Sequence, residues 1–198
     1  MAPPAAAARI NLEKANVLLV EPNTQGMDIL TQIFAGFGVR QPQRAASAAE
    51  AMRIAEGAPL DLIVCEPALP EGDGYDFLMQ LRRARLEPNS FCPAILIAAH
   101  TPKSQVAKAR DCGANFVVVK PLSPRVMLDR ILWIARENRA FIECDSYVGP
   151  DRRFQSLGPP PGTEGRRKDD LPAEVGAAVD PNMSQSEIDD LMKPRRAR

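Results

Sequence analysis

The sequence predicts an α/β fold, a doubly wound parallel sheet of five strands in (βα)5 order, followed by a tail with a short terminal helix. Two patterns predict this fold. Four short, continuous apolar runs, at 17–20, 62–65, 94–97 and 116–119, are typical of parallel strands that helices cover on both faces. Between and after these runs, apolar residues recur at the spacing of an amphipathic helix.

The first half of the fold is expected to hold two strand–helix units. After the strand at 17–20, an apolar helical stripe runs over 27–37. The segment 39–45 is the least strand-like, because it contains Pro42. A sheet tolerates proline on an edge strand, so we place this strand at an edge. An alanine-rich helical stripe over 48–55 then leads into the third strand.

The second half repeats the alternation to the end of the domain. Helical stripes lie at 77–81, 106–112 and 127–135, and each follows one of the remaining strands. Polar residues, prolines and glycines punctuate these helices. Asp73, Thr101 and Ser123 are placed to cap helix starts, Pro102 and Pro124 stand at first helical positions, and Gly38 and Gly113 stand at helix ends.

Composition excludes several classes of protein. The 198 residues carry 25 basic and 25 acidic side chains, and this balance argues against a nucleic-acid binder, which normally has a basic excess. No apolar run approaches the roughly 18–20 residues that span a bilayer, and the first residues lack the pattern of a secretory signal. We therefore expect a cytoplasmic protein that binds neither membrane nor nucleic acid.

Cysteine usage points the same way. Cys65, Cys92, Cys112 and Cys144 have no CxxC spacing, and the chain holds one histidine. Such a set suits neither a zinc site nor a disulfide framework. We expect four small, buried thiols in a reducing compartment.

Proline and glycine divide the chain into parts. They are most concentrated in residues 1–8 and 149–181, which hold too little apolar surface to offset chain entropy. The expected parts are a flexible N-terminus at 1–13, a folded domain at 14–142, a Pro/Gly-rich extension and linker at 143–182, and a short amphipathic docking helix at 183–193.

Charged residues follow three of the predicted strands. Glu21 and Glu66 follow the first and third strands, and Lys120 follows the fifth. In a doubly wound sheet the site lies beyond the carboxyl ends of the strands, so these three groups are expected to converge. Two carboxylates beside an ammonium suit a phosphate or ion-pair site. A solvated ion pair on loops is the alternative.

This arrangement resembles the receiver domain of two-component response regulators. The likeness lies in residues 17–23, 61–66, 69–74 and 113–121, in the family's order and spacing over about 16–140. The resemblance implies a flavodoxin-like, CheY-like fold. It also implies a place for Mg²⁺ and a phosphoryl group at the strand ends.

The functional positions depart from the family's pattern. The acidic pair that holds Mg²⁺ falls at Glu21 and Pro22, and a proline side chain offers no ligand to a hard cation. The phosphoryl-accepting position falls at Glu66. The hydroxyl and aromatic switch positions fall at Ala98 and Val117, and only Lys120 keeps the family's residue.

These departures argue against conventional aspartyl phosphorylation. Phosphoryl transfer depends on positioning and on charge neutralisation by metal, and the longer Glu66 would displace a bound phosphoryl group. We expect no cofactor, Mg²⁺ included. Glu66 beside Lys120 is interpreted either as a permanent partial mimic of the phosphorylated state, with one charge instead of nearly two, or as a partner that satisfies a buried lysine.

The last predicted helix of the domain carries the only tryptophan. At 100° per residue, Trp133 falls opposite the stripe formed by Met127 and Ile131, so it is expected to point away from the sheet. An exposed tryptophan usually has a cover. In receivers, the face made by the fourth helix, fifth strand and fifth helix is the usual docking surface. Either a partner or residues 141–150 are expected to cover Trp133.

Residues 183–192 form a second candidate docking element. Ser184 and Glu187 have capping-box spacing, and Ile188, Leu191 and Met192 share one helical face. A helix this short is marginal alone and gains stability in an apolar groove. The segment resembles the regulator-binding peptide at the N-terminus of the flagellar motor switch protein. That resemblance implies a receiver-binding peptide, which could reach its own Trp133 face or another regulator.

The expected function is signalling by protein contact rather than catalysis. The main hypothesis is a stand-alone degenerate receiver that acts as a phosphorylation-independent adaptor in a two-component or chemotaxis-type network. One alternative is an active phosphoryl-accepting regulator that uses Mg²⁺ and an unusual acceptor. Another is a tail-mediated latch or a competitor for a chemotaxis regulator. Expected partners are proteins, such as another receiver, a histidine kinase or a flagellar component.

Overall fold

A five-stranded parallel sheet forms the centre of the molecule. The computed structural model describes residues 11–136, 140–144, 146–151 and 182–192. The strands follow the order β2-β1-β3-β4-β5, and every neighbouring pair is parallel. This arrangement confirms the predicted fold class. The strands are β1 (Val17–Val20), β2 (Gln43–Ala45), β3 (Leu62–Cys65), β4 (Ala94–Ala98) and β5 (Phe116–Val119).

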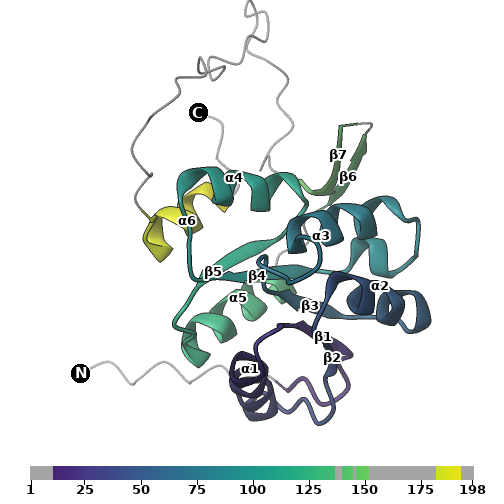
Figure 1. Cartoon of the computed structure of the whole chain (residues 1–198), viewed down its shortest axis with the longest axis vertical. Coiled ribbons are helices and arrows are strands. Elements are labelled where there is room, and N and C mark those ends of the chain that lie inside the picture. Colours follow the sequence, from purple (N-terminus) through teal and green to yellow (C-terminus); the bar gives the residue numbers. More distant parts are fainter. Residues whose placement is uncertain (1–10, 137–139, 145, 152–181, 193–198) are drawn as a thin grey trace, which may run out of the picture.

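Helices cover both faces of this sheet. Figure 1 shows α1 and α5 on one face, with α3 and α4 on the other. Side chains of β1, β3 and β4 are buried along their whole length, as expected of parallel strands between two helical layers. The helices are α1 (Thr24–Gly36), α2 (Ala48–Gly57), α3 (Gly74–Arg83), α4 (Lys103–Asp111) and α5 (Pro124–Arg136), with a 3₁₀ turn at Asn89–Phe91.

Most of the predicted punctuation is confirmed. The Asp73 carboxylate caps α3 by accepting from the backbone N–H of Tyr75 at 2.8 Å. Gly38 and Gly113 follow the ends of α1 and α4 with φ angles of 98° and 86°, in the left-handed region that glycine adopts without strain. The strand with the nearby proline, β2, lies at a sheet edge as predicted.

The prediction that Thr101 caps α4 was wrong. That helix begins at Lys103, and Pro102 occupies the cap position without a side-chain hydrogen bond. The Thr101 hydroxyl instead donates to the carbonyl of Met183 at 3.2 Å. The hydroxyl that the sequence pattern assigned to the start of α4 therefore bonds to a segment more than eighty residues further along the chain.

A β-hairpin follows the five-stranded domain. It pairs β6 (Phe141–Cys144) with β7 (Tyr147–Pro150) in antiparallel register, and Figure 1 shows it beside α3. The buried Arg82 of α3 holds this side of the molecule together: its guanidinium donates to the carbonyls of Gly113 and Ser90 and lies 5.1 Å from the ring centre of Phe141. The boundary predicted at 142/143 thus falls inside a hairpin.

Three of the four cysteines are buried, as predicted, but Cys144 on β6 is exposed. The prediction failed there because 141–144 belongs to a hairpin on the outside of the domain. Among the described residues, the helices are all too short or too polar to cross a bilayer. The predicted flexible N-terminus lies almost wholly outside the described residues, and so does most of the linker at 143–182.

The terminal segment forms the helix α6 (Gln185–Met192), which packs against β5 and α4. The predicted capping box is present: the Glu187 carboxylate accepts from the backbone N–H of Ser184 at 2.8 Å. In Figure 1, α6 is the yellow helix beside α4. Residues far apart in the chain therefore share one face of the molecule.

Candidate functional site

The charged residues predicted to converge meet at the carboxyl ends of the strands. Glu21 directly follows β1 and Glu66 directly follows β3. These two strands are hydrogen-bonded neighbours, so their ends bring the two carboxylates to one place. Lys120 follows β5, and its backbone N–H donates to the carbonyl of Ala98 at the end of β4. Four strand ends thus frame one cluster.

The ammonium of Lys120 bridges both carboxylates. Its Nζ lies 2.8 Å from Glu21 Oε2 and 2.6 Å from Glu66 Oε2. The Glu21 and Glu66 side chains are only 2% and 10% exposed, and the lysine side chain is 27% exposed. Burial lowers the pKa of Lys120, but the hydrogen bonds that its ammonium donates to Glu21 and Glu66 outweigh burial, so the pKa lies above its usual value. The lysine is therefore charged at neutral pH.

The remaining carboxylate oxygens accept backbone hydrogen bonds. Glu21 Oε1 accepts from the N–H of Asn23, and Glu66 Oε1 accepts from the N–H of Ala68, both at 3.1 Å. Each of the four oxygens therefore has a donor. In the described part of the chain, no group of three or more His, Cys, Asp and Glu side chains is arranged to hold a metal ion.

Two glycines allow helices to approach this cluster closely. A Cβ atom on Gly26 of α1 would lie 2.7 Å from Glu21 Cδ, and one on Gly74 of α3 would lie 2.6 Å from the Glu66 carbonyl oxygen. Because neither distance is possible for a real side chain, α1 and α3 pack against the strand ends only with glycine here. Gly26 thus confines the side chain of Glu21, whereas Gly74 packs against the backbone of Glu66.

The other sequence-predicted positions lie around the cluster. Pro22 is half-buried beside Glu21. The Ala98 side chain is buried, and it lines a cavity of about 370 Å³ together with Glu66 and His100. Val117 is buried in β5, and its carbonyl faces α6 rather than the cluster. The salt bridge between Asp73 and Lys108, at 2.6 Å, lies at the start of α3.

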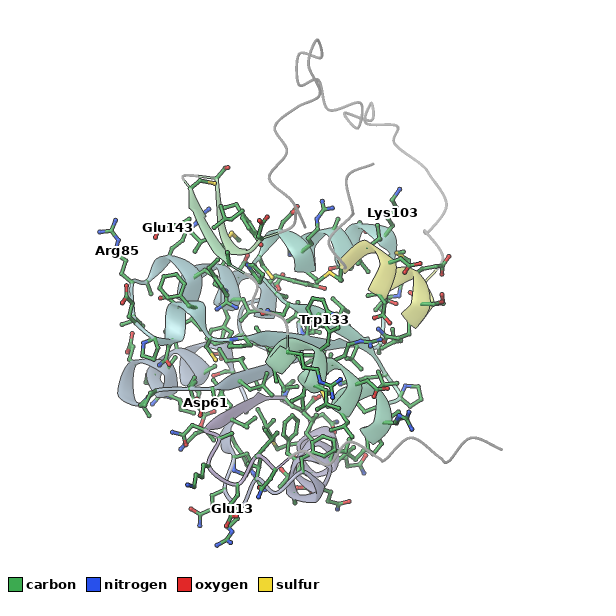
Figure 2. The ribbon with its side chains drawn as sticks, turned by 180° about the vertical axis from the view of Figure 1, so that it is seen from behind. Glu13, Asp61, Arg85, Lys103, Trp133 and Glu143 are labelled. Atoms are coloured by element: carbon green, nitrogen blue, oxygen red, sulfur yellow. The ribbon has the colours of Figure 1, made fainter. Side chains whose placement is uncertain are left out.

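The predicted orientation of Trp133 was wrong. Its ring packs edge-on against Phe116 of β5, with centroids 4.7 Å apart, so it points toward the sheet and not away from it. Seen from behind, Trp133 lies near the middle of the molecule (Figure 2). Met127 and Ile131 of the predicted stripe are buried, whereas Ala135 at its end is exposed. Idealised helical angles alone therefore gave the wrong direction for Trp133.

The predicted docking residues of the tail lie against the domain. Ile188 is fully buried, Met192 is nearly so, and Leu191 is half-buried and packed on the same core. Sequence reasoning missed the polar contacts beside them, which join Gln185 to β5 and Asp189 to Arg130. The available signal was helical spacing, because positions 185, 188, 189 and 192 share one helical face.

Comparison with known proteins gives a consistent result. Residues 17–132 match the family described as "Response regulator receiver domain". The chain is 29% identical over 112 residues to a probable chemotaxis protein CheY of Rhizobium etli, covering 56% of this chain and 84% of that protein. It is 32% identical over 104 residues to the transcriptional regulatory protein KdpE of Mycobacterium tuberculosis, covering 52% and 44%.

Solved structures share the same fold. The CheX–CheY–BeF3–Mg complex of Borrelia burgdorferi gives a TM-score of 0.58 at 25% identity, over 65% of this chain and 97% of that one. A putative response regulator of Chloroflexus aurantiacus gives 0.57 at 25% identity, over 62% and 98%.

The chain spans only part of some relatives. It covers 6% of Histidine kinase 1 of Arabidopsis thaliana and 44% of the KdpE of Mycobacterium tuberculosis, so the likeness concerns one domain of those proteins. The matched family region contains the whole five-stranded sheet and the Glu21–Lys120–Glu66 cluster at its carboxyl end. This chain therefore belongs to the response regulator receiver domain family.

Proposed function

We propose that this protein is a degenerate receiver that acts as a signalling adaptor through protein contact, without phosphorylation and without catalysing a reaction. The observation that carries the proposal is the double salt bridge of Lys120 to Glu21 and Glu66, at 2.8 and 2.6 Å. The negative charge of the nearly buried Glu66 carboxylate already lies beside Lys120, at the position that the resemblance assigns to an incoming phosphoryl group.

The donor set supports a site that works without Mg²⁺. Pro22 offers no side-chain oxygen, and all four oxygens of Glu21 and Glu66 already accept hydrogen bonds. A hard cation needs about six oxygen ligands, so Mg²⁺ would have to displace Lys120 or the backbone donors. Without such a cation, the charge of a transferring phosphoryl group lacks its main neutralising partner.

The cluster also supports a fixed conformational state. Glu66 places one negative charge on Lys120, where a phosphoryl group would carry nearly two. Because the ammonium is held from two sides by nearly buried carboxylates, its position does not depend on a modification. The cluster then carries the same charge at all times, so control of partner binding lies outside this cluster.

Treatment with acetyl phosphate and Mg²⁺, followed by intact-mass measurement, tests this proposal. The unaltered chain is expected to gain no phosphoryl group. A variant with Pro22→Asp, Glu66→Asp and Ala98→Ser restores the family's pattern at three positions and serves as the matched control, which we expect to become labelled. A phosphoryl group on Glu66 of the unaltered chain would overturn the proposal and favour the active-regulator alternative.

The partner is expected to be a protein of a two-component or chemotaxis-type network in the cytoplasm. The supporting observation is the family itself: one similar structure holds a CheY together with CheX, and one relative is a histidine kinase. The motor-switch-like pattern of the tail adds a second candidate function, binding to another receiver. The observation that favours it is that α6 already packs on a receiver-fold surface, its own.

Titration of a peptide spanning 182–193 into a chemotaxis receiver, followed by amide NMR shifts, tests that second function. Shifts confined to the fourth helix, fifth strand and fifth helix of the receiver would support it. Their absence at millimolar peptide would exclude it.

A further inference from the structure

The surface between α4 and α5 is filled by the chain's own terminal helix. β5 is an edge strand, so alternate backbone groups of β5 point away from β4 and need other partners. The side chain of Gln185 supplies them: its Oε1 accepts from the N–H of Val119 at 2.8 Å, and its Nε2 donates to the carbonyl of Val117 at 2.9 Å. One amide thus extends the edge of the sheet as a neighbouring strand would.

A charged pair fixes the orientation of α6. Asp189 forms a salt bridge with Arg130 of α5, and both side chains are less than a fifth exposed. The Arg130 guanidinium also lies 5.5 Å from the ring centre of Phe116, on which Trp133 packs. The helix therefore connects to the only tryptophan of the chain through two side chains.

Apolar burial and the β4–α4 loop complete the seat. Ile188 and Met192 are 0% and 6% exposed. Ahead of the helix, the N–H of Met183 donates to the Thr101 carbonyl at 2.9 Å, and the N–H of Thr101 donates to the Asn182 side chain at 3.1 Å. Within the eight-residue helix α6, Gln185 makes the polar contacts at the sheet edge, Asp189 makes the ionic contact to α5, and Ile188 and Met192 make the apolar contacts. These four residues share one face of the helix.

We propose that residues 182–192 are a tethered ligand that closes the docking face formed by α4, β5 and α5. The pattern that this face recognises is Gln185, Ile188, Asp189 and Met192, at helix positions one, four, five and eight. A partner that uses the same face must present an amphipathic helix with this pattern and must displace α6. Access to the face, rather than phosphorylation, then regulates partner binding.

Tethering favours the occupant from the same molecule. An isolated helix of this length is marginal in water, so α6 gains its structure from the face that it covers. Because α6 belongs to the same chain as this face, its binding is intramolecular, and tethering can give an effective concentration of up to about millimolar. A free peptide at micromolar concentration cannot compete with it. This inference does not depend on whether Glu66 can be phosphorylated.

Binding of a fluorescent peptide with the sequence 182–193 to the full-length chain tests the proposal. Ile188→Asp in the chain places a carboxylate in the apolar contact of α6 and releases α6 from the docking face. Because the tethered competitor is then removed, we expect this variant to bind the peptide at least about tenfold more tightly than the unaltered chain. Ser186→Asp adds the same carboxylate at an exposed position of α6 and is expected to behave like the unaltered chain.

A second test exchanges the charges of the Arg130–Asp189 pair and does not depend on whether Ile188→Asp perturbs the fold. The full chain with Arg130→Glu is expected to bind a peptide carrying Asp189→Arg and to bind the unaltered peptide at least about tenfold less well. Equal binding of both peptides, or equal binding by all three chains in the first experiment, would overturn the proposal. A concentration-dependent dimer that Asp189→Arg dissociates would overturn it too, because it would show exchange of α6 between two copies.

Discussion

The Lys120 ammonium lies 2.6 Å from the Glu66 carboxylate. Glu66 stands at the position where the resemblance to receivers implies an aspartate that accepts a phosphoryl group. Glu21 holds the same ammonium from the adjacent strand end. The three charged groups are thus paired with one another, and their contribution to the unfolding free energy can be measured.

Removal of the lysine should destabilise the fold strongly. Lys120→Met leaves two nearly buried carboxylates side by side without a counter-charge, which we expect to cost about 2–3 kcal/mol of unfolding free energy, somewhat below the usual loss for a fully buried pair. Lys108→Met is the matched control, because its salt bridge to Asp73 is much more exposed and should contribute about 1 kcal/mol or less. Urea unfolding of both variants measures the difference, and equal losses would contradict the account.

The pH dependence of this cluster lies on the alkaline side. The pKa of Lys120 is raised in the folded state above its ordinary value of 10.5. A raised pKa contributes stability that is fully present below the unfolded value and is lost as pH rises through the folded value. The difference in unfolding free energy between the unaltered chain and Lys120→Met should therefore stay constant from pH 7 to about 10 and shrink above it. A difference that shrinks between pH 7 and 9 would show that another group is responsible.

Close packing of α1 on Glu21 gives a test within one helix. Gly26→Ala would place a Cβ atom 2.7 Å from Glu21 Cδ and displace the carboxylate, at a net cost of about 1 kcal/mol or more. Gly36→Ala, near the end of the same helix, meets nothing within 4 Å and should stabilise the protein by up to about 1 kcal/mol. Thermal unfolding distinguishes the two, and stabilisation by both substitutions would show that Glu21 is not confined.

Thiol reactivity should single out the hairpin. Burial raises the pKa of the Cys92 and Cys112 thiols to about 12 and raises that of Cys65 well above its usual value, whereas Cys144 is exposed. Because the thiolate is the reactive form, iodoacetamide at neutral pH should modify Cys144 alone in the folded protein. Peptide mapping by mass spectrometry identifies the site. Rapid modification of Cys92, beside Arg82, would indicate that the hairpin side of the domain opens.

The sequence was sufficient for the fold because its signals are local. Apolar runs, caps and glycines mark β1 to β5 and most helix ends, and the strand ends then place Glu21, Glu66 and Lys120 together. The contacts of α6 could not be predicted in this way. They join residues such as Thr101 and Met183, and no periodicity links segments so far apart. The prediction for Trp133 failed for a related reason, since its contact with Phe116 of β5 joins two elements and does not follow from helical periodicity.

We infer that the Glu21–Lys120–Glu66 cluster is complete without a phosphoryl group or Mg²⁺. Amide NMR of the full chain during titration with beryllofluoride and Mg²⁺ tests it most directly, with the backbone N–H groups of Asn23, Ala68 and Lys120 as reporters. We expect no saturable shift at these amides. Saturable shifts at all three, with a single affinity, would contradict it.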